Sequence, residues 1–154
     1  MEYVAGYLAT ALGIRVDLKT AHEKESATLS HDPGLCRINY GDTPLSGMFN
    51  IYASGLLGET GIRSPEPAVL KKDGQIMLFP APEGFDLPFD LFSAVFYLIT
   101  RYEEYLPYQP DANGRFEADQ SLAFHYNFLE EPVVDQWTGM LKKALAGKYP
   151  QLVL

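Results

Sequence analysis

A helical stripe of large apolar side chains in the middle of the chain constrains the fold more than any other sequence feature. A helix that is apolar over so much of its circumference is buried on more than one side, against a sheet or between other elements. Asp86 is its predicted N-cap, Pro88 takes an early position, and the helix is expected to end before Pro107. The stripe consists of Leu91, Val95, Leu98 and Tyr102, and Phe92, Phe96 and Ile99 widen it.

Shorter patterns on both sides of this helix predict an α+β fold. Helical spacing predicts one helix over residues 3–12, ended by Gly13, and a last helix over residues 132–147. The predicted strands are residues 14–18, 35–40 and 48–52, and a hairpin of 68–70 and 75–79 around Asp73-Gly74. Residues 121–128 form either a short strand or an aromatic loop. We expect one domain over residues 1–154, a small mixed β-sheet with the long amphipathic helix and the C-terminal helix packed on it.

The charge balance argues against two classes of partner. The 12 basic and 20 acidic residues give a formal net charge of −8 at pH 7. Nucleic acids and anionic membrane surfaces are bound mainly by clustered Lys and Arg, so we expect neither as a partner. The chain shows no signal-peptide pattern, and its single cysteine suits a reducing compartment, so we expect a cytoplasmic location.

Motifs for covalent, metal or phosphate chemistry are missing from the sequence. Ser54 lacks the first glycine of a nucleophile elbow, and Cys36 lies in a predicted strand rather than at an electropositive helix start. His22, His31 and His125 do not have the spacing that places two imidazoles on one helix face. We therefore expect no catalytic residue, no metal ligand and no cofactor in this domain.

Two fragments leave an alternative open, a stand-alone metal-dependent hydrolase. Asp17 and Lys19 have the Asp-x-Lys spacing that some nucleases place on a strand. Glu103 and Glu104 are a nominal acid/base pair for a glycan-acting enzyme, although adjacent helix residues point about 100° apart.

The aromatic side chains are concentrated in the second half of the chain. Of the 20 aromatic residues, 12 lie between Phe85 and Phe128. Such rings form a core or serve as protein-interface anchors and sugar platforms. One helix and one turn do not need so many rings to form a core of this size. We therefore expect some of five aromatic residues to stay accessible as interface or glycan-facing residues. These five are Tyr105, Tyr108, Phe116, Phe124 and Tyr126.

Charged residues between these rings form a candidate structural cluster. They are Arg101, Glu103, Glu104, Asp111 and Arg115. We expect at least one of the two arginines to pair with a carboxylate and to fix the 111–116 turn against the long helix.

Several segments together carry a family resemblance. The run Leu87-Pro88-Phe89-Asp90-Leu91-Phe92 is followed by the more specific block Phe96-Tyr97-Leu98-Ile99-Thr100-Arg101-Tyr102-Glu103-Glu104-Tyr105. Further matching segments are Ile38-Asn39-Tyr40, residues 56–62, Asp111-x-x-Gly114-Arg115-Phe116, Ser121-Leu122-Ala123 and Pro132-Val133-Val134-Asp135-x-Trp137. In these segments the chain resembles a bacterial domain found ahead of polysaccharide-deacetylase-like catalytic domains.

The resemblance implies an N-terminal accessory module rather than an enzyme. It places a deacetylase catalytic domain downstream, and a divalent metal would belong to that domain. The family's Asp-rich motif and His-x-x-x-His pair match no position here. The expected partners are therefore the downstream catalytic domain and polysaccharide, with a weak homodimer as a further candidate.

Overall fold

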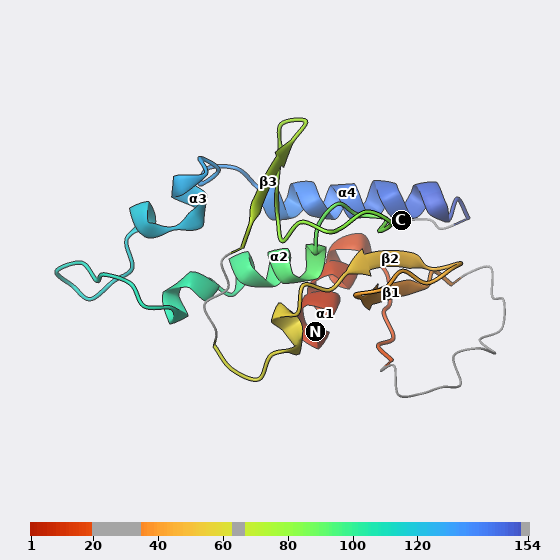
Figure 1. The fold of residues 1–154 in the computed structure, drawn as a ribbon, viewed down its shortest axis with the longest axis horizontal. Helices are drawn as coiled ribbons and strands as arrows, with labels where there is room; N and C mark the ends of the chain where they lie inside the picture. The colour runs from red at the N-terminus through yellow and green to blue at the C-terminus, as the bar shows by residue number, and fades with distance from the viewer. Residues whose placement is uncertain (20–34, 63–66, 152–154) are drawn as a thin grey trace.

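The computed structural model describes residues 1–19, 35–62 and 67–151 (Figure 1). The helices are α1 (Glu2–Leu12), α2 (Leu91–Ile99), α3 (Leu122–His125) and α4 (Val133–Lys148). The strands are β1 (Ile38–Gly41), β2 (Phe49–Tyr52), β3 (Val69–Lys72) and β4 (Gln75–Leu78). Short 3₁₀ turns are η2 (Leu56–Gly58), η3 (Tyr102–Tyr105) and η4 (Ala118–Gln120).

The predicted α+β class is confirmed, with helices and short strands along the chain. The described strands form two separate two-stranded sheets, one in which β1 and β2 are parallel and one in which β3 and β4 are antiparallel. The hairpin predicted at Asp73-Gly74 joins β3 to β4, and both turn residues have positive φ, 52° and 76°. This is the backbone that Asp-Gly favours in a two-residue hairpin turn.

The central helix α2 is buried on several sides, as its apolar stripe predicts. It contacts α1, β4 and α4, and Figure 1 shows it in the middle of the molecule. Leu91, Ala94 and Val95 are completely buried. The helix α4, which also contacts α2, contributes the buried Trp137. The indole Nε1–H of Trp137 donates to the Ile76 carbonyl over 2.6 Å.

The bounds of α2 differ from the prediction at both ends. Asp90 is the N-cap instead of Asp86, because residues 88–90 are held extended by backbone hydrogen bonds to residues 79–81. The helix ends at Ile99, well before Pro107. Two residues after this end, Arg101 takes a left-handed conformation with φ 52°. Backbone pairing and this reversal shorten the helix that the apolar pattern indicates.

The structure differs from the prediction in two further segments. Residues 14–18 have no regular secondary structure, and residues 15–19 are exposed. Within residues 121–128 the chain forms the short helix α3, because the Ser121 hydroxyl accepts from the Phe124 N–H over 3.1 Å and caps it. A capping serine favours a helical turn over an extended strand.

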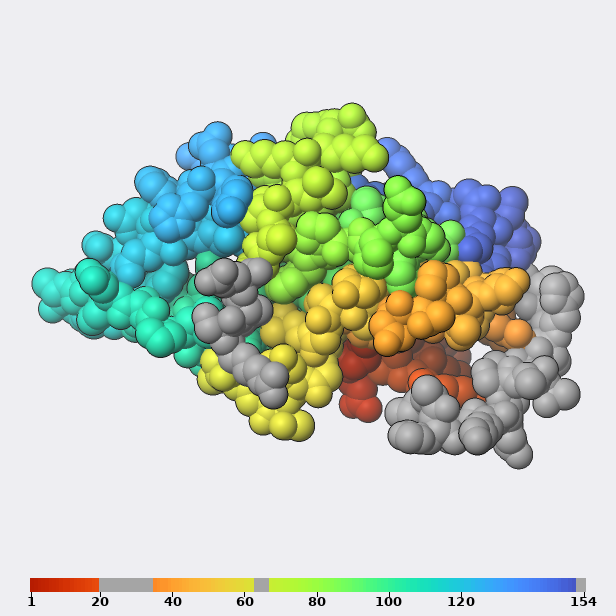
Figure 2. Space-filling view, viewed as in Figure 1, coloured from red at the N-terminus to blue at the C-terminus, as the bar shows by residue number. Residues whose placement is uncertain are grey.

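Residues 101–131, which we call the arm, extend away from the rest of the molecule. In Figures 1 and 2 the arm forms the left end of the molecule, in turquoise and light blue. Only Tyr102, Ser121 and Phe128 of the arm are buried. Most of the aromatic block that the sequence concentrates here therefore lies outside the hydrophobic core.

Candidate functional site

Exposed rings on the arm are the main candidate for a functional surface. Tyr105 is 63% exposed, Phe124 52% and Tyr126 40%. Tyr108 is 36% exposed, and its ring meets the half-buried Phe116 edge-on at 5.3 Å between centroids. Four of the five candidate interface residues therefore present aromatic surface to solvent.

The arm is held in place by polar contacts at its base. Lys71 of β3 donates from Nζ to the Tyr126 carbonyl over 2.8 Å. The Glu103 carboxylate accepts from the Leu122 N–H over 2.7 Å and so joins η3 to α3. Burial raises the pKa of Glu103, and burial together with this carboxylate raises the pKa of Tyr97. These hydrogen bonds fix the segments of the arm that carry the exposed rings.

Both arginines of the predicted polar cluster pair with carboxylates, as expected. Arg101 pairs with Glu104, and Arg115 pairs with Asp111 through Nη2 at 2.8 Å and Nε at 2.9 Å. The predicted role of fixing the 111–116 turn against the long helix is wrong for these pairs, because their partners are only three and four residues apart.

Asp111 instead organises its own turn. Its carboxylate accepts from the backbone N–H groups of Asn113 and Arg115, each over 2.8 Å. These hydrogen bonds from Arg115, its side chain included, lower the pKa of Asp111.

The residues of the hydrolase alternative do not form a shared site. Asp17 and Lys19 are exposed in the irregular segment after α1. Glu103 and Glu104 are adjacent, but one bonds the Leu122 backbone and the other pairs with Arg101. Among residues 1–19, 35–62 and 67–151, no group of three His, Cys, Asp or Glu side chains could hold a metal ion. His22 and His31 lie outside the described residues.

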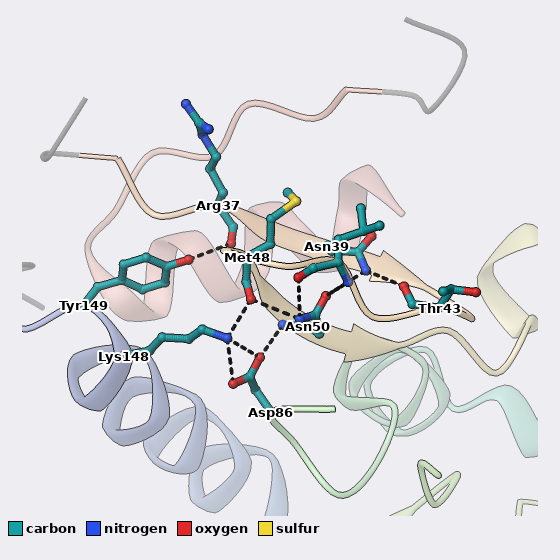
Figure 3. A network of polar contacts seen from close by, with 9 residues as sticks. Arg37, Asn39, Thr43, Met48, Asn50, Asp86, Lys148 and Tyr149 are labelled. Atoms are coloured by element: carbon teal, nitrogen blue, oxygen red, sulfur yellow. Dashed lines mark hydrogen bonds and ion pairs between the residues drawn. The ribbon is translucent and has the colours of Figure 1, made fainter. Parts of the chain in front are cut away.

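The sequence interpretation missed a polar network that joins the end of α4 to the parallel strands (Figure 3). Lys148 donates from Nζ to both Asp86 carboxylate oxygens, at 2.9 and 2.7 Å, and to the Met48 carbonyl at 2.6 Å. Asp86 also accepts from the Asn50 N–H over 2.6 Å. Asp86 is separated from Lys148 by 62 residues, so no local pattern signals this contact.

A second missed network surrounds Asp90, which is completely buried. Its carboxylate accepts from the N–H groups of Ser93 at 3.0 Å and Ser54 at 2.7 Å, and from the Tyr40 hydroxyl at 2.9 Å. Burial and the neighbouring carboxylate raise the pKa of Tyr40, so the phenol keeps its proton and serves as a donor. The carboxylate therefore caps the first turn of α2 and ties that helix to Tyr40 and Ser54.

Comparisons with known proteins identify a family without an assigned activity. No described helix is long and apolar enough to cross a membrane. No curated protein and no solved structure matches the sequence. A family model described as a family of unknown function, DUF7033, matches residues 1–150. The chain therefore belongs to this family, DUF7033.

Proposed function

We propose that this chain is a non-catalytic accessory domain of a polysaccharide-deacetylase-like protein, and that it docks onto the catalytic domain of that protein through the arm. The observation that carries the proposal is the set of exposed rings Tyr105, Phe124 and Tyr126 on a projecting, structured segment. Tyr and Phe side chains are enriched as anchors in protein interfaces, because they bury a large area at low conformational cost.

The charge of the arm indicates the kind of surface it would contact. Residues 101–131 contain seven acidic residues and two arginines, and both arginines are already paired within the arm. A partner surface with exposed Lys and Arg would complement this charge. Such a contact can be weak, since a tether supplies an effective concentration on the order of millimolar.

Thermal melting tests the docking function. The domain is compared alone and joined to a polysaccharide-deacetylase-like catalytic domain, as wild type and with Tyr105→Ala plus Phe124→Ala. We expect the joined wild type to melt several degrees higher, at roughly 2–4 °C per kcal/mol of contact energy, and the arm variant to lose this rise.

The matched control removes two exposed rings away from the arm, Tyr3→Ala plus Tyr7→Ala on α1, which are 64% and 39% exposed in the wild type. This control should keep the full rise. Equal melting temperatures for the isolated and joined wild-type domain would show that the arm does not dock.

Enzyme assays test the non-catalytic part of the proposal. The purified chain should release no acetate from acetylated sugars, with or without Zn²⁺. Acetate release that is lost on Glu103→Gln would instead support the glycan-acting alternative, and DNA cleavage that is lost on Asp17→Asn would support the nuclease-like one.

A further inference from the structure

The far end of the arm contains a pocket that the docking function does not use. It is a depression of about 620 Å³ that is open to solvent. Two short segments form its walls. The lining residues are Pro107, Tyr108, Gln109 and Pro110 from one segment, and Glu117, Asp119 and Gln120 from the other.

The two walls are joined by a pair of amide hydrogen bonds. The Gln109 N–H donates to the Gln120 side-chain oxygen over 2.9 Å, and the Gln120 side-chain nitrogen donates back to the Gln109 carbonyl over 2.7 Å. At one side the Tyr108 hydroxyl donates to the Gly114 carbonyl over 3.3 Å. The pocket is therefore formed before any ligand arrives, which lowers the ordering cost of binding.

The lining restricts the chemistry of a ligand. The Tyr108 ring and the two prolines offer apolar surface, while Glu117 and Asp119 offer carboxylates that have no ion-pair partner within the described part of the chain. Carboxylates only accept hydrogen bonds, so a fitting ligand carries several O–H or N–H donors beside an apolar face. The two carboxylates would repel an anionic ligand. A purely apolar ligand would displace water from both carboxylates without replacing the hydrogen bonds that the water made.

We propose that this pocket binds one sugar ring of a polysaccharide that carries no negative charge. The C–H face of the ring would lie on Tyr108 and its hydroxyl groups would donate to Glu117 and Asp119. The inference goes beyond docking and involves none of Tyr105, Phe124 and Tyr126, so either proposal can fail without the other.

The pocket supplies its own spectroscopic reporter, the side-chain amide of Gln120. Two-dimensional ¹H–¹⁵N NMR would follow this amide during titration of the chain with neutral and amino hexasaccharides, namely those of glucose, mannose, N-acetylglucosamine and glucosamine. The galacturonic acid hexamer and pentalysine serve as anionic and peptide probes. We expect at least one neutral or amino hexasaccharide to shift the Gln120 signals, and the galacturonic acid hexamer to leave them unchanged.

Variants then locate the binding. Tyr108→Ala and the isosteric Asp119→Asn should each weaken binding of the active hexasaccharide about tenfold. Glu130→Gln, an exposed charge change elsewhere on the arm, should leave it unchanged. Asp119→Asn keeps the shape of the wall and gives an answer even where Tyr108→Ala disturbs the loop.

Three outcomes would overturn the inference. The first is that no neutral or amino hexasaccharide shifts the Gln120 amide. The second is that pentalysine binds and the sugars do not, which would make the pocket a peptide site. The third is equal weakening by Glu130→Gln and Asp119→Asn, which would indicate general attraction to an acidic arm.

Discussion

Single residues in this fold take their chemistry from burial. Asp90 is completely buried, yet three donors surround its carboxylate, so its desolvation is offset by hydrogen bonds. At the half-buried Cys36, by contrast, desolvation is the largest effect, and burial raises the pKa of the thiol to about 11. The same residue would be reactive in an exposed, electropositive setting.

The Cys36 thiol is therefore expected to react slowly near neutral pH. Because only the thiolate is alkylated, the iodoacetamide rate of the folded chain at pH 8 should be at least about tenfold below that of the urea-unfolded chain. The rate should keep rising between pH 9 and pH 11 as the raised pKa is approached. Mass spectrometry measures it without ambiguity, since the chain has one cysteine. A plateau near pH 9 would contradict an effect of burial.

At the scale of elements, backbone conformation decides how each glycine responds to substitution. Gly74 in the β3–β4 turn has φ 76°, whereas Gly139 lies inside α4, and a Cβ at either position would meet no atom within 4 Å. Space is equally available at both, so only the backbone differs. The two glycines form a matched pair.

Alanine at these two glycines should change stability in opposite directions. Gly74→Ala should lower the free energy of unfolding by about 1 kcal/mol, because alanine disfavours positive φ. Gly139→Ala should raise it by about 0.5–1 kcal/mol through helix propensity. Urea denaturation measures both. A destabilised Gly139→Ala variant would mean that the outer face of α4 packs more closely than the structure indicates.

At the scale of the whole molecule, the Lys148–Asp86 contact connects the last helix to the parallel strands. Lys148→Met should cost about 1–2 kcal/mol of unfolding free energy, because Asp86 and the Met48 carbonyl lose a charged donor. Lys142→Met, an exposed lysine on the same helix, is the control and should change stability by less than about 0.5 kcal/mol.

A double-mutant cycle separates the contact from the residues that make it. Asp86→Asn combined with Lys148→Met should cost less than the sum of the two single substitutions, because both remove the same ion pair. Additive costs would show that Lys148 and Asp86 stabilise the fold independently.

Local sequence patterns by themselves determined much of the element order. Gly13 ends α1 in a left-handed conformation, Asp73-Gly74 makes its hairpin turn, and the spacing of Val133, Trp137, Leu141 and Leu145 marks the buried face of α4. These features depend on residues within a few positions of one another. The accessibility of the arm rings could also be expected, because the aromatic block exceeds what one helix and one turn can bury.

The tertiary structure alone decided where α2 begins, that β1 pairs with β2 in parallel, and that the distant Lys148 and Asp86 meet. The local pattern predicts Asp86 as the helix cap, and the backbone pairing of residues 79–81 with 88–90 makes Asp90 the cap instead. The pocket at the far end of the arm depends on two hydrogen bonds between Gln109 and Gln120, which are eleven positions apart. Such contacts depend on how distant segments are placed in space, and a linear pattern does not encode that placement because its information extends over only one or two turns.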